Sequence, residues 1–307
     1  MKKFLQIVIL SLIAASSAFA QGKDALPFSR IDRNPITSGF AGAGAAYDGS
    51  AAYSAFGNAA TLPFYSGKLD AAFSYQGWAP TTAKSNNLTV GVAYKVSKHI
   101  AFSLGYSLQN GAAYDVLDSD GRITGTFSPK DHVIAAGFGF GFGKFSVGVN
   151  ARFLMQMLSS SLSYNGFSGD VFLAYQPIKS LRIAAGVSTL GNGITSSTKK
   201  TYSQPTSAKL GVNWGQVFAQ TSRVDLLADF DYYFSGQFGA VIGVGYSWND
   251  TVFVRAGYRY ASQYCVIPTH LALGLGAKFA GFRVDVSYLT ASPALGNTIN
   301  IGLGYTF

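Results

Sequence analysis

The residues of this chain that could carry out acid–base or nucleophilic chemistry are few and widely spaced. The histidines are His99, His132 and His270. The one set that a hydrolase could use is His270 with Ser287 and Asp285, because such an enzyme needs a nucleophile, a base and an acid that orients the base. A lone histidine is more often structural than catalytic, so we expect His270 to be structural and predict no catalytic residues.

The chain also offers little for metals or cofactors. Asp115, Asp118 and Asp120 have a spacing that resembles a calcium loop, but the glutamate that should follow them is missing. Asp120 and Gly121 instead fit a two-residue hairpin turn. No cluster of histidine, cysteine and aspartate has zinc spacing. The glycines of Gly137–Gly143 alternate with phenylalanine, which favours a strand over a phosphate loop. We predict neither a metal site nor a cofactor.

Charged and polar side chains recur at every second position in several segments. Asp229 and Asp231 are two positions apart, and Arg255 and Arg259 are four positions apart. Residues two apart in a strand lie on the same face, so we expect these side chains to point inward together. The candidate inward-facing residues are Asn150, Arg152, Gln156, Asp170, Asp229, Asp231, Arg255, Arg259, Arg283 and Asp285.

Two interpretations fit these inward charges. They could form a selectivity ladder or hold a polar head group, or they could pair with one another and tie down the interior. Charges buried inside a protein must be paired or hydrated, and removing one partner of a buried pair is costly. We therefore favour a paired polar network.

The composition identifies the kind of protein in which such strands would sit. Of the 307 residues, 48% are hydrophobic and 15% aromatic, but only 12% are charged, and 36 are glycine. Soluble domains carry about 25% charged residues, so this chain is short of the polar side chains that an aqueous surface needs. It suits a barrel that presents apolar side chains to lipid and small or polar ones to its lumen.

The net charge of +9 is spread over turns and strands without a basic run. We therefore expect no nucleic-acid partner. The charge fits contact with anionic outer-membrane lipopolysaccharide or a lumen that favours anions, and it fits solvated turn residues equally well. Cys265 is the only cysteine, so no disulfide can form within the chain.

Residues 1–20 have the features of a secretory signal peptide. Lys2 and Lys3 form a positive start, an apolar stretch follows, and Ala18–Ala20 is a small-residue cleavage site. Loss of the two lysines would leave a mature chain of charge +7 (9 − 2) that starts at Gln21. No later window is apolar over the ~18 residues that indicate a spanning helix. Because lipid admits only helices and closed barrels, we predict a bacterial outer-membrane β-barrel.

Alternation of apolar and polar residues predicts about fourteen strands over residues 69–307. It is clearest at the end, where Ile299, Ile301, Leu303, Tyr305 and Phe307 share one face. The predicted strands start near Leu69, Asn87, Ile100, His132, Phe145, Leu162, Leu181, Ala208, Arg223, Phe238, Val252, Thr269, Phe282 and Thr298. Tight connections alternate with longer ones, which in such barrels places the short turns, and here the C-terminus, on the periplasmic side.

Residues 21–68 differ from the rest of the chain. They are rich in glycine, alanine, serine and tyrosine and show no long alternation. They could form a periplasmic tail or fold into the barrel as a plug, and their small side chains favour the plug. Glycines on the inward strand faces, such as Gly137, Gly139, Gly274 and Gly302, leave room beside the wall for either that segment or a ligand.

Short motifs in this segment follow a characteristic order. They are Leu26-Pro27-Phe28, the run Ile36–Ala46, Asp48 with Ser50-Ala51-Ala52, and Gly57–Leu62. This order resembles the N-terminal region of the FadL-like superfamily and, within it, the PorV/PorQ-type outer-membrane proteins of Bacteroidetes. Asn58, Ala59, Ala60 and Leu62 occupy the family's Asn-Pro-Ala-x-Leu plug motif, with Ala59 in place of proline. The similarity in sequence covers residues 26–64, and the resemblance implies a fourteen-stranded barrel.

The resemblance implies two roles, neither of which breaks covalent bonds. PorV-type members are accessory subunits of larger outer-membrane machines, notably in type IX secretion, and they hold or shuttle exported proteins. FadL-type members carry hydrophobic molecules through a plugged barrel and release them sideways. The compact predicted loops leave little material for a ligand gate. We therefore expect a docking subunit of a larger outer-membrane barrel or secretion complex, with a FadL-like channel for hydrophobic or small solutes as the alternative.

Overall fold

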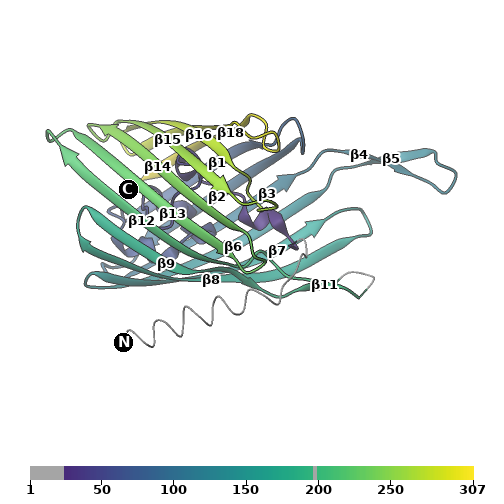
Figure 1. Cartoon of the computed structure of the whole chain (residues 1–307), viewed down its shortest axis with the longest axis horizontal. Coiled ribbons are helices and arrows are strands. Elements are labelled where there is room, and N and C mark those ends of the chain that lie inside the picture. The colour runs from purple at the N-terminus through teal and green to yellow at the C-terminus, as the bar shows by residue number, and fades with distance from the viewer. Residues whose placement is uncertain (1–23, 196–198) are drawn as a thin grey trace.

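Fourteen antiparallel strands close into a barrel in the computed structural model, which describes residues 24–195 and 199–307 (Figure 1). The predicted fourteen-stranded barrel is confirmed, whereas the predicted signal peptide of residues 1–20 lies outside the described residues. The barrel strands are β1 (Leu69–Trp78), β2 (Ser85–Lys95), β3 (Ile100–Asn110), β6 (Lys130–Phe142), β7 (Phe145–Met157), β8 (Ser163–Ile178), β9 (Leu181–Gly191), β12 (Ser207–Phe218), β13 (Ser222–Tyr233), β14 (Phe238–Trp248), β15 (Val252–Ala261), β16 (His270–Phe279), β17 (Phe282–Thr290) and β18 (Thr298–Thr306).

The first and last strands pair with each other and complete the barrel. β1 runs antiparallel to β18 from the Asp70–Thr306 pair to the Gly77–Ile299 pair. The backbone N–H groups of Lys68 and Leu69 donate to the carbonyl of Phe307. Each barrel strand therefore has two neighbours, and the closed sheet has no edge whose backbone groups would face lipid unpaired.

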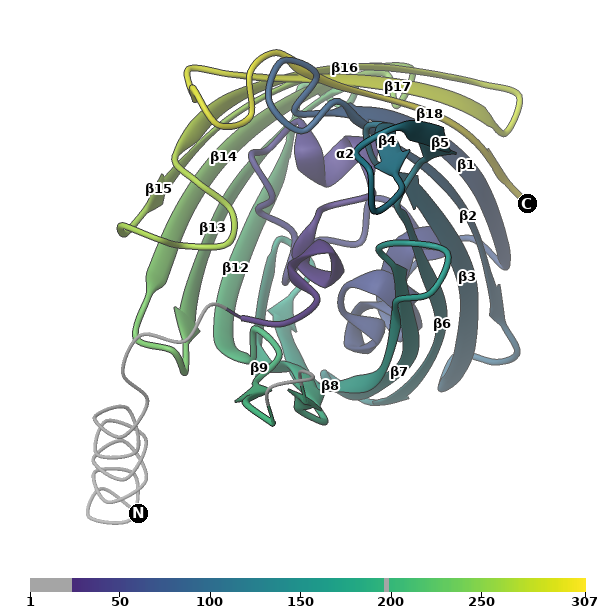
Figure 2. The same cartoon turned by 90° about the vertical axis from the view of Figure 1, so that its right-hand side faces the viewer.

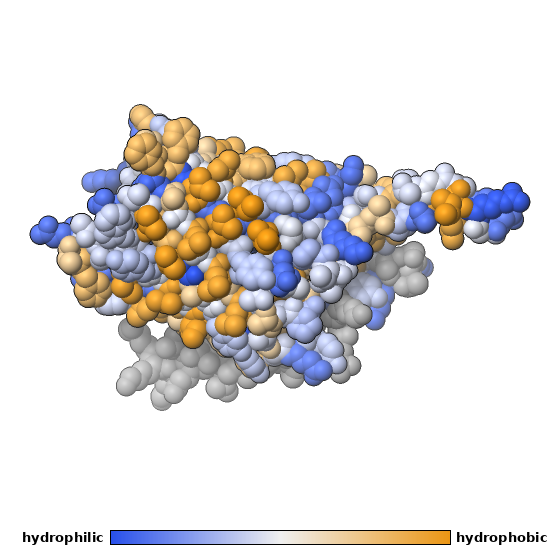
Figure 3. Space-filling model, turned by 90° about the horizontal axis from the view of Figure 1, so that it is seen from above, coloured by the Kyte–Doolittle hydropathy of each residue, from blue (hydrophilic) through white to orange (hydrophobic). Residues whose placement is uncertain are grey.

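The predicted alternation separates an apolar outer wall from a polar lumen. Ile242 is 63% exposed on the outside, whereas Asn300, in β18, is fully buried inside. Figure 3 shows apolar residues along the outer wall. Tyr246, Trp248 and Tyr258 also have exposed side chains, as aromatic residues at a lipid interface do. Among the described residues, no helix is long and apolar enough to cross a membrane.

The two ends of the barrel differ in the length of their connections. One end, here the turn end, carries residues 96–99, 143–144, 179–180, 219–221, 249–251 and 280–281 and the C-terminus. The other, the loop end, carries residues 79–84, 111–129, 158–162, 192–206, 234–237, 262–269 and 291–297. Two short hairpins rise from the loop end, β4 (Tyr114–Leu117) with β5 (Ile123–Phe127) and β10 (Ile194–Thr195) with β11 (Thr201–Tyr202).

The β4–β5 hairpin projects well beyond the barrel (Figure 1). Its turn contains the acidic residues whose spacing resembles a calcium loop. The carboxylate of Asp118 accepts hydrogen bonds from the backbone N–H groups of Asp120 and Arg122, and Gly121 has a φ of 79°. Asp118 therefore stabilises a hairpin turn, as the Asp120-Gly121 pair predicts.

The described N-terminal segment, residues 24–68, threads through the lumen from end to end and is called the plug below. At the loop end Ala25 N–H donates to the carbonyl of Ser203, and at the turn end Lys68 pairs with Phe307. Figure 2 shows the plug, in purple, inside the ring of strands. It contains the short helices η2 (Pro27–Arg30), α2 (Pro35–Ser38), η3 (Ala51–Phe56) and η4 (Ala59–Phe64). These residues lie inside the barrel rather than as a tail beyond it.

Glycines on the inner wall allow the plug to touch the backbone of the strands. A Cβ at Gly148 would overlap the backbone of Ala59 and Ala60, and one at Gly257 would overlap the backbone of Phe40. The inward-facing glycines noted in the sequence also allow this close approach. Plug residues lie next to Gly137, Gly139, Gly141, Gly274 and Gly302. The room beside these glycines is thus filled by the plug.

Substitution of Gly148 tests this close packing. Gly148→Val should displace η4 from β7 and lower the free energy of unfolding by about 1–3 kcal/mol, as overpacking does. Gly77→Val is the matched control, because a Cβ at Gly77 meets nothing within 4 Å. Urea denaturation measures the change in the free energy of unfolding. Trypsin cleavage at the plug's Arg30 and Arg33 reports displacement of the plug. Equal behaviour of the two variants would contradict the packing described.

Candidate functional site

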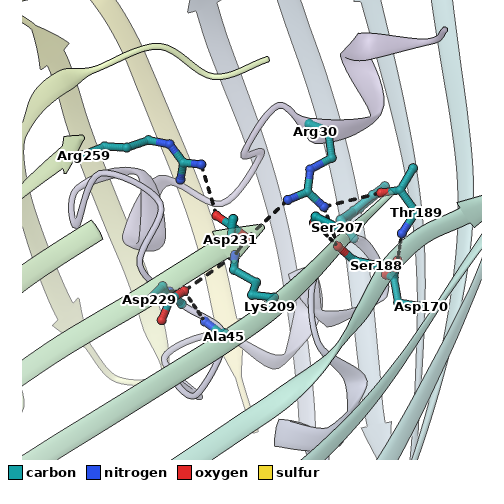
Figure 4. A network of polar contacts seen from close by, with 12 residues as sticks. Arg30, Ala45, Asp170, Ser188, Thr189, Ser207, Lys209, Asp229, Asp231 and Arg259 are labelled. Carbon is teal, nitrogen blue, oxygen red and sulfur yellow. Dashed lines mark hydrogen bonds and ion pairs between the residues drawn. The ribbon is translucent and has the colours of Figure 1, made fainter. Parts of the chain in front are cut away.

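The aspartate at the centre of the predicted polar network, Asp231 on β13, is shared by three cations. Arg259 on β15 lies 3.1 Å from its carboxylate, Arg30 of the plug 3.5 Å and Lys209 on β12 3.6 Å. Figure 4 shows these side chains converging on Asp231 from the plug and from neighbouring strands. The structure thus brings predicted residues together with two cations, Arg30 and Lys209, that the alternation pattern did not single out.

Asp229, two residues earlier on the same face, holds the plug by its backbone. Its carboxylate accepts hydrogen bonds from the N–H groups of Gly44 and Ala45, both at 2.9 Å. Lys209 lies 3.6 Å from the same oxygen. Hydrogen bonds to an ionised acceptor are stronger than neutral ones, so Asp229 anchors this bend of the plug to the wall.

A third aspartate lies at an irregularity in the wall. The β8–β9 ladder shifts register at Asp170, opposite Ser188 and Thr189. Thr189 has a φ of 58°, and its N–H donates to the Asp170 carboxylate at 2.8 Å. Asp170 also forms an ion pair with Arg152, and Arg30 donates to Ser188 at 2.5 Å. The side chain of Asp170 therefore replaces the backbone acceptor that the bulge removes from the ladder.

The remaining predicted charges form a separate cluster nearer the turn end. Asp285 lies 2.8 Å from both Arg255 and Arg283. Arg283 also donates to the carbonyl of Gly49 in the plug at 3.0 Å. The predicted charges are therefore paired, in three groups around Asp231, Asp170 and Asp285, and each group contacts plug residues. Of the predicted polar residues, Asn150 also donates to a plug carbonyl, that of Gly57, at 2.8 Å.

The plug leaves a cavity of about 160 Å³ between itself and the wall, in the half of the barrel nearer the loop end. This loop-end cavity is lined by charged residues, including Arg152, Lys209, Asp231 and Arg259, and by apolar ones, including Trp78 and Phe172. Within the described residues, six of its lining side chains have a buried polar atom without a hydrogen-bond partner. They are Ser29 Oγ, Asp32 Oδ2, Tyr53 OH, Arg152 Nε, Tyr233 OH and Arg259 Nε.

Arg33 of the plug also lines this cavity, and it is only 3% exposed. It donates to Ser107 Oγ and to the carbonyls of Ile31 and Phe28, each at 2.9 Å. These acceptors are all neutral, and among the described residues Arg33 forms no ion pair. Arg33 is thus a buried cation whose charge is not compensated by a directly paired carboxylate.

A second cavity, of about 150 Å³, lies at the turn end. Its lining includes Asp48, Phe64, Arg182 and Arg223. Arg182 pairs with Asp48 at 2.9 Å and lies 4.8 Å above the ring of Phe64. The loop-end and turn-end cavities are therefore on opposite sides of the plug.

The predicted plug motif lies between these two cavities. Asn58 caps η4 by accepting a hydrogen bond from Ala60 N–H at 2.8 Å, and its amide donates to the carbonyl of Ala45 at 2.7 Å. Ala59 and Leu62, in η4, are buried. Alanine at position 59 is therefore compatible with a packed plug, because the cap comes from the side chain of Asn58.

The hydrolase arrangement considered from the sequence does not form. In the β16–β17 register Ser287 lies opposite Gly274, four residues from His270, which is about 13 Å along a strand. The ring of His270 hydrogen-bonds to the carbonyl of Pro268, and Asp285 is engaged by two arginines. His270 lines the loop-end cavity instead.

The cavity residues that sequence reasoning missed include Ser29, Arg30, Asp32, Arg33, Tyr53, Lys209 and Tyr233. Five of them belong to the plug, where no alternation indicates which side chains face inward. The one available signal was the group Arg30, Asp32 and Arg33, which places three charges in four positions of a segment otherwise rich in small residues.

The similarity of this chain to known proteins is found in its fold and not in its sequence. No protein-family model and no curated protein matches the sequence. Among solved structures, the toluene transporter TodX of Pseudomonas putida is similar, with a TM-score of 0.63 at 16% identity over 89% of this chain and 97% of that one. The toluene transporter TbuX of Ralstonia pickettii gives 0.61 at 14% identity, over 89% and 97%. A FadL homologue of Pseudomonas aeruginosa gives 0.52 at 12%, over 89% and 95%.

This chain shares its fold with FadL-like channels. The broader resemblance noted in the sequence is therefore supported at the level of fold, whereas the PorV/PorQ part of it stays a prediction.

The three-cation site around Asp231 gives a stability prediction. Asp231→Asn leaves Arg30, Lys209 and Arg259 without their shared carboxylate, and the free energy of unfolding should fall by about 3–5 kcal/mol. The control is Asp250→Asn, because Asp250 pairs with Lys278 at the surface and its side chain is 74% exposed. That change should cost less than about 1 kcal/mol. Urea unfolding followed by tryptophan fluorescence measures both, and a small loss for Asp231→Asn would show that the cluster is not needed for stability.

Proposed function

We propose that this chain is an outer-membrane channel that passes small organic solutes through a plugged barrel. The observation that carries the proposal is the pair of cavities on opposite sides of the plug, inside a closed barrel with the fold of TodX and TbuX. The titles of those two structures describe toluene transporters. The channel that the sequence left as the alternative therefore becomes the leading function.

The apolar outer wall and the fold of FadL-like channels support a position in the bacterial outer membrane. By the usual polarity of such barrels the loop end faces outward and the turn end faces the periplasm. A solute would then enter the loop-end cavity from outside the cell. The described plug separates that cavity from the turn-end cavity, so passage requires some movement of the plug.

The accessory role in a larger outer-membrane complex is a second proposal. The observation that favours it is the projecting β4–β5 hairpin, where Leu117 is 57% and Ile123 65% exposed although both are apolar. A pull-down of the tagged chain from native outer membranes in mild detergent tests it. A stoichiometric large barrel or secretion component would support this role, and recovery of the chain alone would oppose it. Contact with lipopolysaccharide likewise stays a prediction.

Blocking the loop-end cavity tests the channel. Ser29 lines it, and among residues 24–195 and 199–307 its hydroxyl has no hydrogen-bond partner, so Ser29→Phe adds a ring without removing a bond seen there. In cells that lack their general porins, we expect the unmodified chain to speed uptake of labelled toluene, benzyl alcohol or benzoate. Ser29→Phe should reduce that uptake towards the level of cells without the chain.

The control for this experiment is Ser161→Phe, which adds the same ring at an exposed position in the 158–162 connection. It should leave uptake unchanged. If none of the three compounds enters faster in cells that carry the unmodified chain at normal abundance, the channel proposal is wrong.

A further inference from the structure

We infer that the loop-end cavity binds a small organic carboxylate in preference to an uncharged hydrocarbon of the same size. The inference deepens the proposed function and rests on it, because it names the class of solute that the channel would accept. It is carried by three features of the cavity: its charge, its unpartnered donors and its size.

The charge of the lining is positive. Five cationic side chains line the cavity, Arg30, Arg33, Arg152, Lys209 and Arg259, against three carboxylates, Asp32, Asp170 and Asp231. Two further carboxylates act on these cations from outside the lining, Asp229 on Lys209 and Asp131 on Arg33, so the excess of positive charge belongs to the lining itself.

Arg33 is the cation that has no paired carboxylate. Its three hydrogen bonds go to neutral acceptors, and a buried charge without a counter-charge is costly. The guanidinium carries five N–H donors, so it retains N–H groups beyond those three bonds. A carboxylate entering the cavity would supply both the missing negative charge and acceptors for these groups.

The unpartnered polar atoms of the lining are mainly donors. Arg152 Nε and Arg259 Nε can only donate, and the hydroxyls of Ser29, Tyr53 and Tyr233 can donate as well. Of the six unpartnered atoms described in this lining, Asp32 Oδ2 is the one that can act only as an acceptor when ionised. An ionised carboxylate offers acceptors alone, which matches this surplus. A hydrocarbon would leave every one of these groups unsatisfied, at about 1–3 kcal/mol each.

The size of the cavity limits the organic part of the solute. Its volume of about 160 Å³ is close to that of an engineered protein cavity of about 150 Å³ that binds benzene. Apolar side chains also contribute to the lining, among them Phe56, Trp78, Phe172 and Leu289. The cavity therefore suits one ring or a short chain next to the charged group. Benzoate is a suitable probe.

Ordered water is the competing occupant, because water can also satisfy buried donors. Water both donates and accepts, so a cavity built for water would show no preference for an anion over a neutral molecule of equal size. A comparison of benzoate with benzyl alcohol separates the two, since both carry one ring and only benzoate is charged.

The experiment is isothermal titration calorimetry on the purified full chain in a neutral maltoside detergent. We expect benzoate to bind and benzyl alcohol to bind at least roughly ten-fold more weakly, because a hydrogen bond to a charged group contributes about 1.5–3 kcal/mol. Arg33→Gln should abolish the preference for benzoate. Since Arg33 also bonds to the plug backbone, this variant alone would not separate binding from plug stability.

Two tyrosine variants make that separation. Tyr53→Phe and Tyr233→Phe remove single hydroxyls, which lie beside Ser74 and Arg30, so each should lower the urea midpoint less than Arg33→Gln, which disrupts three hydrogen bonds. Each should weaken benzoate binding by roughly ten-fold. The matched control is Tyr65→Phe, whose hydroxyl bonds to Thr306 at 3.0 Å outside the cavity. It should leave benzoate binding unchanged.

The outcomes separate this inference from the function on which it rests. Equal binding of benzoate and benzyl alcohol, or benzoate binding that both tyrosine variants leave unchanged, overturns the inference. If toluene still enters cells through the chain in that case, the channel stands and accepts a neutral solute. If benzoate binds as expected but no compound enters cells, the carboxylate site stands and the channel proposal falls.

Discussion

Every backbone N–H and C=O of a segment in lipid must find a partner within the protein, because the hydrocarbon interior contains no water. The architecture of this chain follows from that constraint. β1 and β18 pair along their length, and the carbonyl of Phe307 accepts from Lys68 and Leu69, so the sheet closes on itself. Where the wall departs from a regular ladder, beside Asp170, a carboxylate takes the N–H of Thr189 that the bulge leaves free. Closure also fixes which side chains meet lipid and which meet the lumen.

In this closed barrel the plug occupies the lumen through close backbone contact with the wall. Glycines such as Gly148 and Gly257 remove side chains from the wall where the plug approaches most closely. Charged side chains then fix the plug at particular positions. Asp229 holds the backbone at Gly44 and Ala45, and Asp231 gathers Arg30 with two cations of the wall. The filling is incomplete, and it leaves a cavity on each side of the η4 region.

The similar structures share a fold with this chain, and a fold alone does not determine a substrate. What a barrel accepts depends on the side chains that line its interior. In this barrel the cationic side chains that line the loop-end cavity outnumber the carboxylates in the lining, and several hydrogen-bond donors there have no partner in the part of the chain that the structure describes. The polar lining arises mostly from the plug and from inward positions on β7, β12, β13 and β15. The outward positions on the same strands are mostly apolar.

The alternation of apolar and polar residues is enough to predict the barrel, its fourteen strands and the inward direction of five charged residues, Asp229, Asp231, Arg255, Arg259 and Asp285. It could do so because a two-residue period reports directly which face of a strand is buried. The distance between Ser287 and His270, the pairing of Arg30 and Lys209 with Asp231, and the cavity between the plug and the wall emerge only in the folded chain. These facts depend on strand register and on the path of a segment without periodicity. Both are set by contacts between residues far apart in the chain, such as Arg30 with Asp231, which no local pattern encodes.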